Sequence, residues 1–313
     1  MFTPIQFYLE NIVGGAYMEV DGVFSGGGIK AFAFLGALDV IEKKGIKFKR
    51  LAGTSAGALL AALVMAGYRY EELVQILSEI NTEQFLDQHP LIKRIPILKW
   101  ILLYRNLGLY RGDILERWVE SLLKQKGIHT FGDLQDKELF IIGTDITNGR
   151  LVVFPNDLEE YYGIQPNQFS IAKAVRISVS IPYFFRPVIL KSKYNYDNVL
   201  IDGGTLSNFP YWIFKGEGDK QVRPSLGIKS SAKEISIPKQ KVKNAVDLLQ
   251  AIFQTVLQAH DSRYVSEDDA KNIIFLPIDG VSAINFDLTE EEKNYLINVG
   301  KFKAEAFFKK WHG

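Results

Sequence analysis

Cysteine is absent from this chain of 313 residues, and histidine occurs only four times. Without cysteine there is no disulfide bond, no thiol nucleophile and no cysteine-ligated metal. An excess of one charge is also lacking, because 37 lysine and arginine residues face 36 aspartate and glutamate residues. A chain with a net charge of +1 has no strong attraction for polyanions, so we expect no nucleic-acid partner.

We also expect no segment that directs the chain into a membrane. No lysine or arginine precedes Lys30, so the cationic start of a secretory signal is lacking. The uncharged run 51–68 is long enough to suggest a membrane span, but glycine, threonine and serine interrupt its first half. We expect its second half, 56–66, to be a buried core helix. We also expect a cytoplasmic protein that can associate peripherally with a membrane.

What the chain does contain is enough apolar sequence for a large core, since 47% of its residues are hydrophobic and 23% are charged. Its length allows one large α/β domain or two smaller ones. Hydrophobic patterning predicts strands at 18–24, 138–147, 151–154, 198–201, 226–229 and 273–277. It predicts helices at 31–44, 56–66, 70–80, 113–124, 170–180, 245–257 and 289–310.

Ser55 is a candidate nucleophile, because it stands between Gly53 and Gly57 in the pattern G-x-S-x-G. On a sharp turn from a strand into a helix, residues two positions either side of the serine crowd each other. Glycine at both positions removes the Cβ atoms that would collide. The same turn leaves the N–H of Ala56 at a helix start, where it can face a developing negative charge.

A second glycine turn, Gly26-Gly27-Gly28, follows the strand at 18–24 and precedes the helix at 31–44. Strand, glycine loop and helix N-terminus together favour an anion site. One interpretation is a dinucleotide site, but the acidic residue expected about 20 residues further on is lacking at the end of the second strand. The other interpretation, which we favour, is an oxyanion hole beside Ser55.

A serine needs a base to take its proton, and the four histidines all lie in settings typical of surface or capping residues. Asp202 remains: it ends the predicted strand 198–201 and is followed by Gly203 and Gly204. An ordinary Asp-Gly turn is the alternative. A carboxylate would need burial that raises its pKa before it could serve as the base.

These motifs together resemble the patatin-like phospholipase family. The resemblance lies in residues 26–30, 53–57 and 202–204, with support from 174–182 and 208–210, and it covers roughly residues 18–215. It implies a three-layer α/β/α fold with a central, mostly parallel sheet, and metal-independent hydrolysis of lipid acyl esters without a cofactor. It also implies that Ser55 is the nucleophile, that Asp202 is the base, and that the loop Gly26–Gly28 with Ala56 N–H stabilises the oxyanion.

The chain departs from the family at one position, where Ala31 replaces the glycine that usually closes the first motif. We expect a slightly tighter oxyanion loop there. Lys30 matches the basic position of the motif, and a solvated lysine at a helix start is an equally good interpretation.

We expect a catalytic core over residues 18–215 that includes a cap or lid insertion at 84–125. Residues 1–17 would be an N-terminal extension and 216–313 the rest of the same domain. The expected activity is hydrolysis of phospholipid or lysophospholipid acyl esters. Lipid acyl transfer and a non-catalytic lipid-binding module are the alternatives, and the expected partners are the lipid substrate and, transiently, a membrane surface.

The stretch 91–105 is the candidate membrane contact, because it mixes four cations with apolar residues and has no acid. Trp100 suits the interfacial layer and Lys99 suits anionic lipid headgroups. A pair of short cap helices over the acyl pocket is the alternative interpretation.

The combined substitution Trp100→Ala and Lys99→Glu is expected to weaken binding to anionic vesicles and to slow vesicle hydrolysis. Turnover of a soluble short-chain ester should stay near normal, because only the interface is altered. Vesicle co-sedimentation beside a soluble-ester assay measures both. Equal slowing of both substrates would instead indicate a pocket-lining stretch, and no change would rule out membrane contact.

Overall fold

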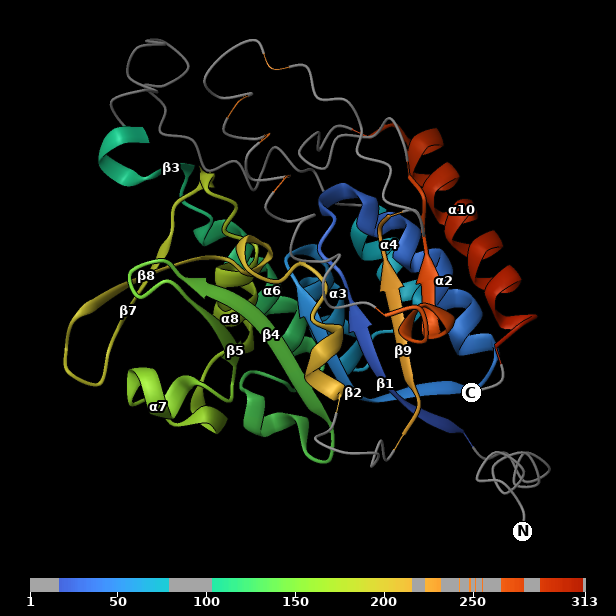
Figure 1. The fold of residues 1–313 in the computed structure, drawn as a ribbon, viewed down its shortest axis with the longest axis horizontal. Helices are drawn as coiled ribbons and strands as arrows, with labels where there is room; N and C mark the ends of the chain where they lie inside the picture. The colour runs from blue at the N-terminus through green and yellow to red at the C-terminus, as the bar shows by residue number, and fades with distance from the viewer. Residues whose placement is uncertain are drawn as a thin grey trace.

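The computed structural model describes residues 17–78, 103–215, 223–231, 266–278 and 288–311, with the single positions 242, 248, 251 and 255. One sheet organises these residues (Figure 1). Its strands, in spatial order, are β10 (Ile273–Phe275), β9 (Ser225–Lys229), β1 (Met18–Phe24), β2 (Ile46–Thr54), β4 (Glu138–Asp145), β8 (Asp197–Asp202) and β7 (Val188–Lys191). Strand β5 (Arg150–Phe154) also pairs with β4, and β3 (Gly108–Tyr110) pairs separately with β6 (Tyr183–Phe185).

The α-helices and 3-10 helices connect these strands. The α-helices are α2 (Phe32–Lys43), α3 (Ala56–Met65), α4 (Tyr70–Ser78), α6 (Asp113–Gln125), α7 (Leu158–Tyr162), α8 (Ile171–Ser178) and α10 (Glu290–Phe308). The 3-10 helices are η2 (Gly28–Ala31), η5 (Phe131–Leu134), η6 (Pro166–Gln168), η7 (Gly203–Thr205), η8 (Tyr211–Phe214) and η9 (Asp269–Asn272).

Alternate residues of the central strands enter two different cores, because successive side chains of a strand point to opposite faces. On one face, Val20, Leu51 and Ile141 join the larger core with residues of α2, α3, α4, α6, α8 and α10. On the other face, Val23 and Ile142 belong to a smaller cluster that includes residues of η8. Both faces of the central strands are therefore covered.

The sheet has a parallel part, from β10 to β4, and an antiparallel part, formed by β4 with β5, β8 and β7. The pairs β10–β9, β9–β1, β1–β2 and β2–β4 are parallel. The pairs β4–β5, β4–β8 and β7–β8 are antiparallel. The predicted mixed α/β fold with a central, mostly parallel sheet is confirmed.

The strands predicted at 138–147 and 151–154 are present as the antiparallel pair β4 and β5, with Asn148 and Gly149 in the turn between them. The helix predicted at 245–257 lies almost wholly outside the described residues, as does the part of the proposed lid from 84 to 102. Lys99 and Trp100 therefore also lie outside them.

Two strands meet end to end along the same edge of β4. Strand β2 pairs with β4 up to Thr54 opposite Ile142, and β8 arrives from the other direction to end with Asp202 opposite Gly143. Strand β5 occupies the opposite edge of β4 from Ile141 to Asp145 and so overlaps both stretches. The C-terminal ends of β2 and β8 thus face each other at neighbouring positions of one strand.

Candidate active site

Ser55 lies on the turn between β2 and α3 and has backbone angles of φ 53° and ψ −124°. A positive φ is strained for a residue with a side chain, so the surroundings must hold it. A Cβ atom built on Gly53 would lie 2.5 Å from the carbonyl oxygen of Gly57, and one on Gly57 would lie 2.5 Å from the carbonyl oxygen of Phe24. Both glycines are therefore required by close backbone contacts at this turn.

The hydroxyl of Ser55 donates a hydrogen bond to Oδ2 of Asp202 at 2.7 Å. The other carboxylate oxygen, Oδ1, accepts the N–H of Gly204 at 2.7 Å. Ser55 is 8% exposed and Asp202 is 2% exposed. The two residues that the sequence singled out thus form a buried pair, and the glycines after Asp202 allow the turn that supports it.

Burial raises the pKa of Asp202 from 3.8 to about 7, because an ionised carboxylate loses its hydration there. The hydrogen bonds from Ser55 and from Gly204 N–H act in the opposite direction, since they stabilise the ionised form. A carboxylate with this pKa can both accept and return a proton near neutral pH.

Ser178, at the end of α8, holds the nucleophile turn. Its hydroxyl accepts the N–H of Ser55 at 2.9 Å and donates to the carbonyl of Ile142 at 2.6 Å. The N–H of Asp202 donates to the carbonyl of Ser180 at 2.9 Å. One short segment therefore fixes the backbone of both members of the pair, a role that the sequence did not reveal.

The same segment is anchored by Arg176, which is 3% exposed. Its guanidinium donates to Ser180 Oγ at 2.5 Å, to the carbonyl of Arg186 at 2.8 Å and to the carbonyl of Arg111. A buried guanidinium that bonds to carbonyl oxygens from separate segments holds those segments at a fixed separation.

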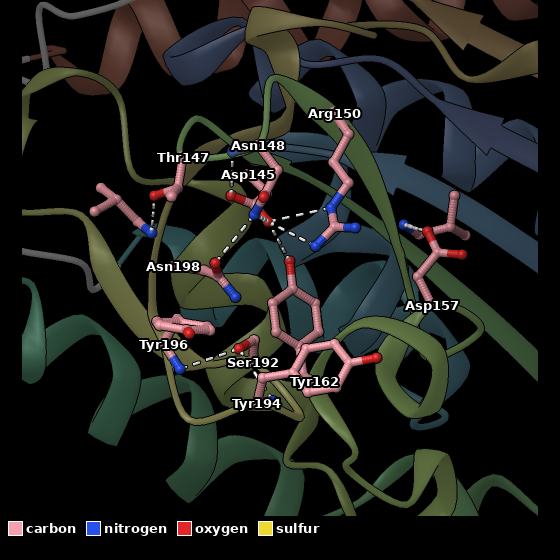
Figure 2. A network of polar contacts seen from close by, with 12 residues as sticks. Asp145, Thr147, Asn148, Arg150, Asp157, Tyr162, Ser192, Tyr194, Tyr196 and Asn198 are labelled. Atoms are coloured by element: carbon pink, nitrogen blue, oxygen red, sulfur yellow. Dashed lines mark hydrogen bonds and ion pairs between the residues drawn. The ribbon is translucent and has the colours of Figure 1, made fainter.

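A second polar network fixes the strand that carries Asp202 (Figure 2). At its centre, the fully buried carboxylate of Asp145 accepts hydrogen bonds from Asn148, Arg150 and Tyr162. Asn148 Nδ2 also donates to Asn198 Oδ1 in β8 at 3.0 Å. Burial, together with Asp145, raises the pKa of Tyr162, so its phenol stays protonated as the donor. The β4–β5 turn thereby holds β8 in register.

The glycine loop after β1 lies directly against the nucleophile. A Cβ atom built on Gly26 would lie 3.4 Å from Cβ of Ser55. The N–H of Gly26 donates to the carbonyl of Asn208 at 2.9 Å, so this N–H is engaged. Within the described parts of the chain, no acceptor takes the N–H of Gly27, Gly28 or Ala56.

The side chain of Lys30 contacts a segment outside this loop: its Nζ donates a hydrogen bond to the carbonyl oxygen of Ile278 at 3.0 Å. It ties η2 to the segment that follows β10. Ala31 ends η2 and leads into α2 without a break in the helical chain. Lys30 therefore supports the loop from outside.

Within the described residues, no histidine contacts Ser55 or Asp202. His129 is the one histidine there; its side chain is 48% exposed and lies 3.7 Å from Glu120. The described residues also contain no group of three or more His, Asp or Glu side chains placed to hold a metal ion. No helix among them is both long and apolar enough to cross a membrane.

A serine on a strained strand-to-helix turn, bonded to a buried carboxylate, is the arrangement of an activated nucleophile. The chain belongs to the patatin-like phospholipase family, whose model matches residues 22–215. Membership supports lipid hydrolysis as the general activity.

Two similar proteins match most or part of the chain. It is 46% identical over 294 residues to the uncharacterized protein YqhO of Bacillus subtilis (strain 168), covering 94% of this chain and 99% of that one. It is 27% identical over 201 residues to the "Probable lipid hydrolase 463L" of Invertebrate iridescent virus 6, covering 60% of each.

The fold is also found in a solved structure. VipD from Legionella pneumophila matches with a TM-score of 0.56 and 18% identity, covering 94% of this chain and 67% of VipD. At this identity the likeness concerns the fold alone.

The raised pKa of Asp202 predicts a pH-dependent loss of stability. Between its ordinary pKa and about 7, the folded protein holds a proton on Asp202 that the unfolded chain has released. The free energy of unfolding therefore falls as pH rises through this window, by at most about 4 kcal/mol from this group. The Asp202→Asn variant lacks this titration, so its stability relative to the wild type should increase from pH 5 to pH 8.

Urea unfolding of both proteins at pH 5 and pH 8 measures this difference, in which the contributions of other titrating groups cancel. A difference that is the same at both pH values would show that burial does not raise the pKa of Asp202.

Proposed function

We propose that this protein is a serine lipid acyl hydrolase that cleaves fatty-acyl esters of phospholipids or lysophospholipids through an acyl-enzyme on Ser55. The observation that carries the proposal is the 2.7 Å hydrogen bond from Ser55 Oγ to the buried carboxylate of Asp202. Family membership and the name of the viral relative, a probable lipid hydrolase, support the substrate class.

In the first half of the reaction, Ser55 Oγ attacks the ester carbonyl carbon while its proton passes to Asp202 Oδ2. The carbonyl oxygen becomes an oxyanion, which accepts hydrogen bonds from the N–H groups of Gly27, Gly28 and Ala56. The tetrahedral intermediate then collapses, the bond to the alcohol breaks, and Asp202 returns the proton to the leaving alcohol oxygen. Gly26 shapes the loop in this scheme, because its own N–H is held by Asn208.

In the second half, a water molecule attacks the acyl carbon and gives a proton to Asp202. Collapse of the second intermediate releases the fatty acid, and the proton returns to Ser55 Oγ. The pKa of about 7 fits both directions of transfer, since the carboxylate is neither too weak a base nor too weak an acid.

The proposal includes transient contact with a membrane surface. Large side chains are exposed around the β3–β6 pair: Tyr104 is 87%, Leu107 54% and Tyr183 47% exposed. Gly108 pairs with Tyr183. Leu107 precedes Gly108, so Leu107 and Tyr183 lie near each other. Arg105, which follows Tyr104 in the sequence, is also exposed and carries a positive charge suited to anionic lipid.

Removal of either member of the pair should abolish hydrolysis. Ser55→Ala removes the nucleophile and Asp202→Asn removes the base, so each should lower kcat by about 10⁴-fold or more. A soluble ester assay measures the loss, and labelling by a fluorophosphonate probe should disappear in Ser55→Ala. Replacement of all four histidines should leave most of the activity, and a single histidine substitution that matched the loss at Ser55 would contradict the Ser–Asp assignment.

The rate on a neutral ester should rise with pH, because only ionised Asp202 accepts the proton of Ser55. We expect kcat/KM to increase about tenfold per pH unit below pH 7 and to level off above it. Rates corrected for uncatalysed hydrolysis at each pH test this. A profile that levels off near pH 4, the ordinary pKa of a carboxyl group, would be incompatible with a buried base.

A further inference from the structure

The carbonyl oxygen of Gly26 accepts hydrogen bonds from two hydroxyl groups. Ser230 Oγ donates to it at 2.9 Å and Ser25 Oγ donates to it at 3.0 Å. The N–H of Ser230 in turn donates to Ser25 Oγ at 3.0 Å, so the two serines hold each other in place. Ser25 follows β1, whereas Ser230 follows β9 in the neighbouring part of the sheet.

Gly26 is therefore held on both sides of its Cα. Its N–H is bound by the carbonyl of Asn208 at 2.9 Å, and its carbonyl is bound by the serine pair. Ser230 also lies directly against the next residue, because a Cβ atom on Gly27 would come within 2.6 Å of Ser230 Oγ.

The Gly26 carbonyl and the Gly27 N–H belong to the same peptide plane and point in opposite directions, as in any trans peptide. The one cis peptide bond in the described residues is Phe154–Pro155. With the carbonyl held toward Ser230, the Gly27 N–H points away from Ser230, and no acceptor in the described residues takes it.

This peptide plane needs such a restraint, because glycine stands on both sides of it. Neither residue has a Cβ to limit its backbone angles, so the plane can turn over at little steric cost. Turned over, it would present a carbonyl oxygen where an N–H had been, and that oxygen would repel an oxyanion instead of stabilising it.

We propose that Ser230 is a positioning residue for the reaction: its hydroxyl fixes the Gly26–Gly27 peptide so that the Gly27 N–H stays available to the oxyanion. This inference rests on the proposed function, because an oxyanion forms only if Ser55 attacks an ester. Ser230 acts through the peptide and touches no reacting atom.

The test compares Ser230→Ala and Ser230→Thr with the wild type and with Ser192→Ala. Thr keeps the hydroxyl and is the conservative rescue. Ser192 is a matched control, because its hydroxyl likewise fixes backbone, accepting the N–H groups of Tyr194 and Tyr196 in the β7–β8 turn (Figure 2).

Two constants are measured besides kcat: KM for a soluble short-chain ester and the inhibition constant of a trifluoromethyl ketone. Attack of Ser55 on this ketone forms a tetrahedral adduct with an oxyanion and passes the hydroxyl proton to Asp202. Neither constant depends on how much of a preparation is folded, so the comparison survives a partial loss of stability. Titration with a fluorophosphonate gives the active concentration for kcat.

We expect Ser230→Ala to lower kcat about tenfold, with KM unchanged and the ketone bound about tenfold more weakly. The effect stays below the 10²–10³-fold loss typical of a whole missing donor, since Ser25 still holds the carbonyl. Ser230→Thr and Ser192→Ala should both keep the wild-type constants.

An unchanged kcat in Ser230→Ala would overturn the inference, and so would a lower kcat without weaker ketone binding or an equal loss in Ser192→Ala. These results leave the proposed function intact as long as the wild type hydrolyses the ester and takes up the fluorophosphonate. A wild type that does neither would overturn both.

Discussion

Strand β4 has one edge left after β5 has paired with the other, and two strands share it. Strand β2 takes the first part of the edge and β8 takes the rest from the opposite direction. The chain leaving β2 turns away at Ser55, and Asp202 occupies the next position along β4. The turn that strains the serine backbone therefore also brings its hydroxyl against the aspartate.

The partners of Asp202 explain why its pKa is raised. Its carboxylate accepts hydrogen bonds from a hydroxyl and a backbone N–H, and burial outweighs both in setting its pKa. Asp145, two positions beyond Gly143 on β4, is equally buried, but a guanidinium, an amide and a phenol surround it. Two buried carboxylates of one sheet therefore have different surroundings: the side chains around Asp145 tie the β4–β5 turn to β8, whereas Asp202 is hydrogen-bonded to the hydroxyl of Ser55.

The sequence predicted what depends on local sterics. The turn at Ser55 follows from glycines within two residues of it, and the Asp-Gly-Gly turn follows a clear strand pattern. It did not predict that β8 runs against β4, because the direction of a strand depends on register with a distant partner. The roles of Ser178 and Ser230 were also hidden, since their hydroxyls bind backbone groups 123 and 204 residues away and a lone serine has no periodic pattern.

The separation of Ser55 and Asp202 along the chain has a consequence during synthesis. The two residues are 147 positions apart, and the strand that brings them together is made between them. In a chain that is still emerging from the ribosome, β1, α2 and β2 are made before β8, so Ser55 lacks its hydrogen bond to Asp202 until β8 is added to β4. The pair of Ser55 and Asp202 therefore reports that β8 has docked on β4, while β9 and β10 of the same sheet are still to be made.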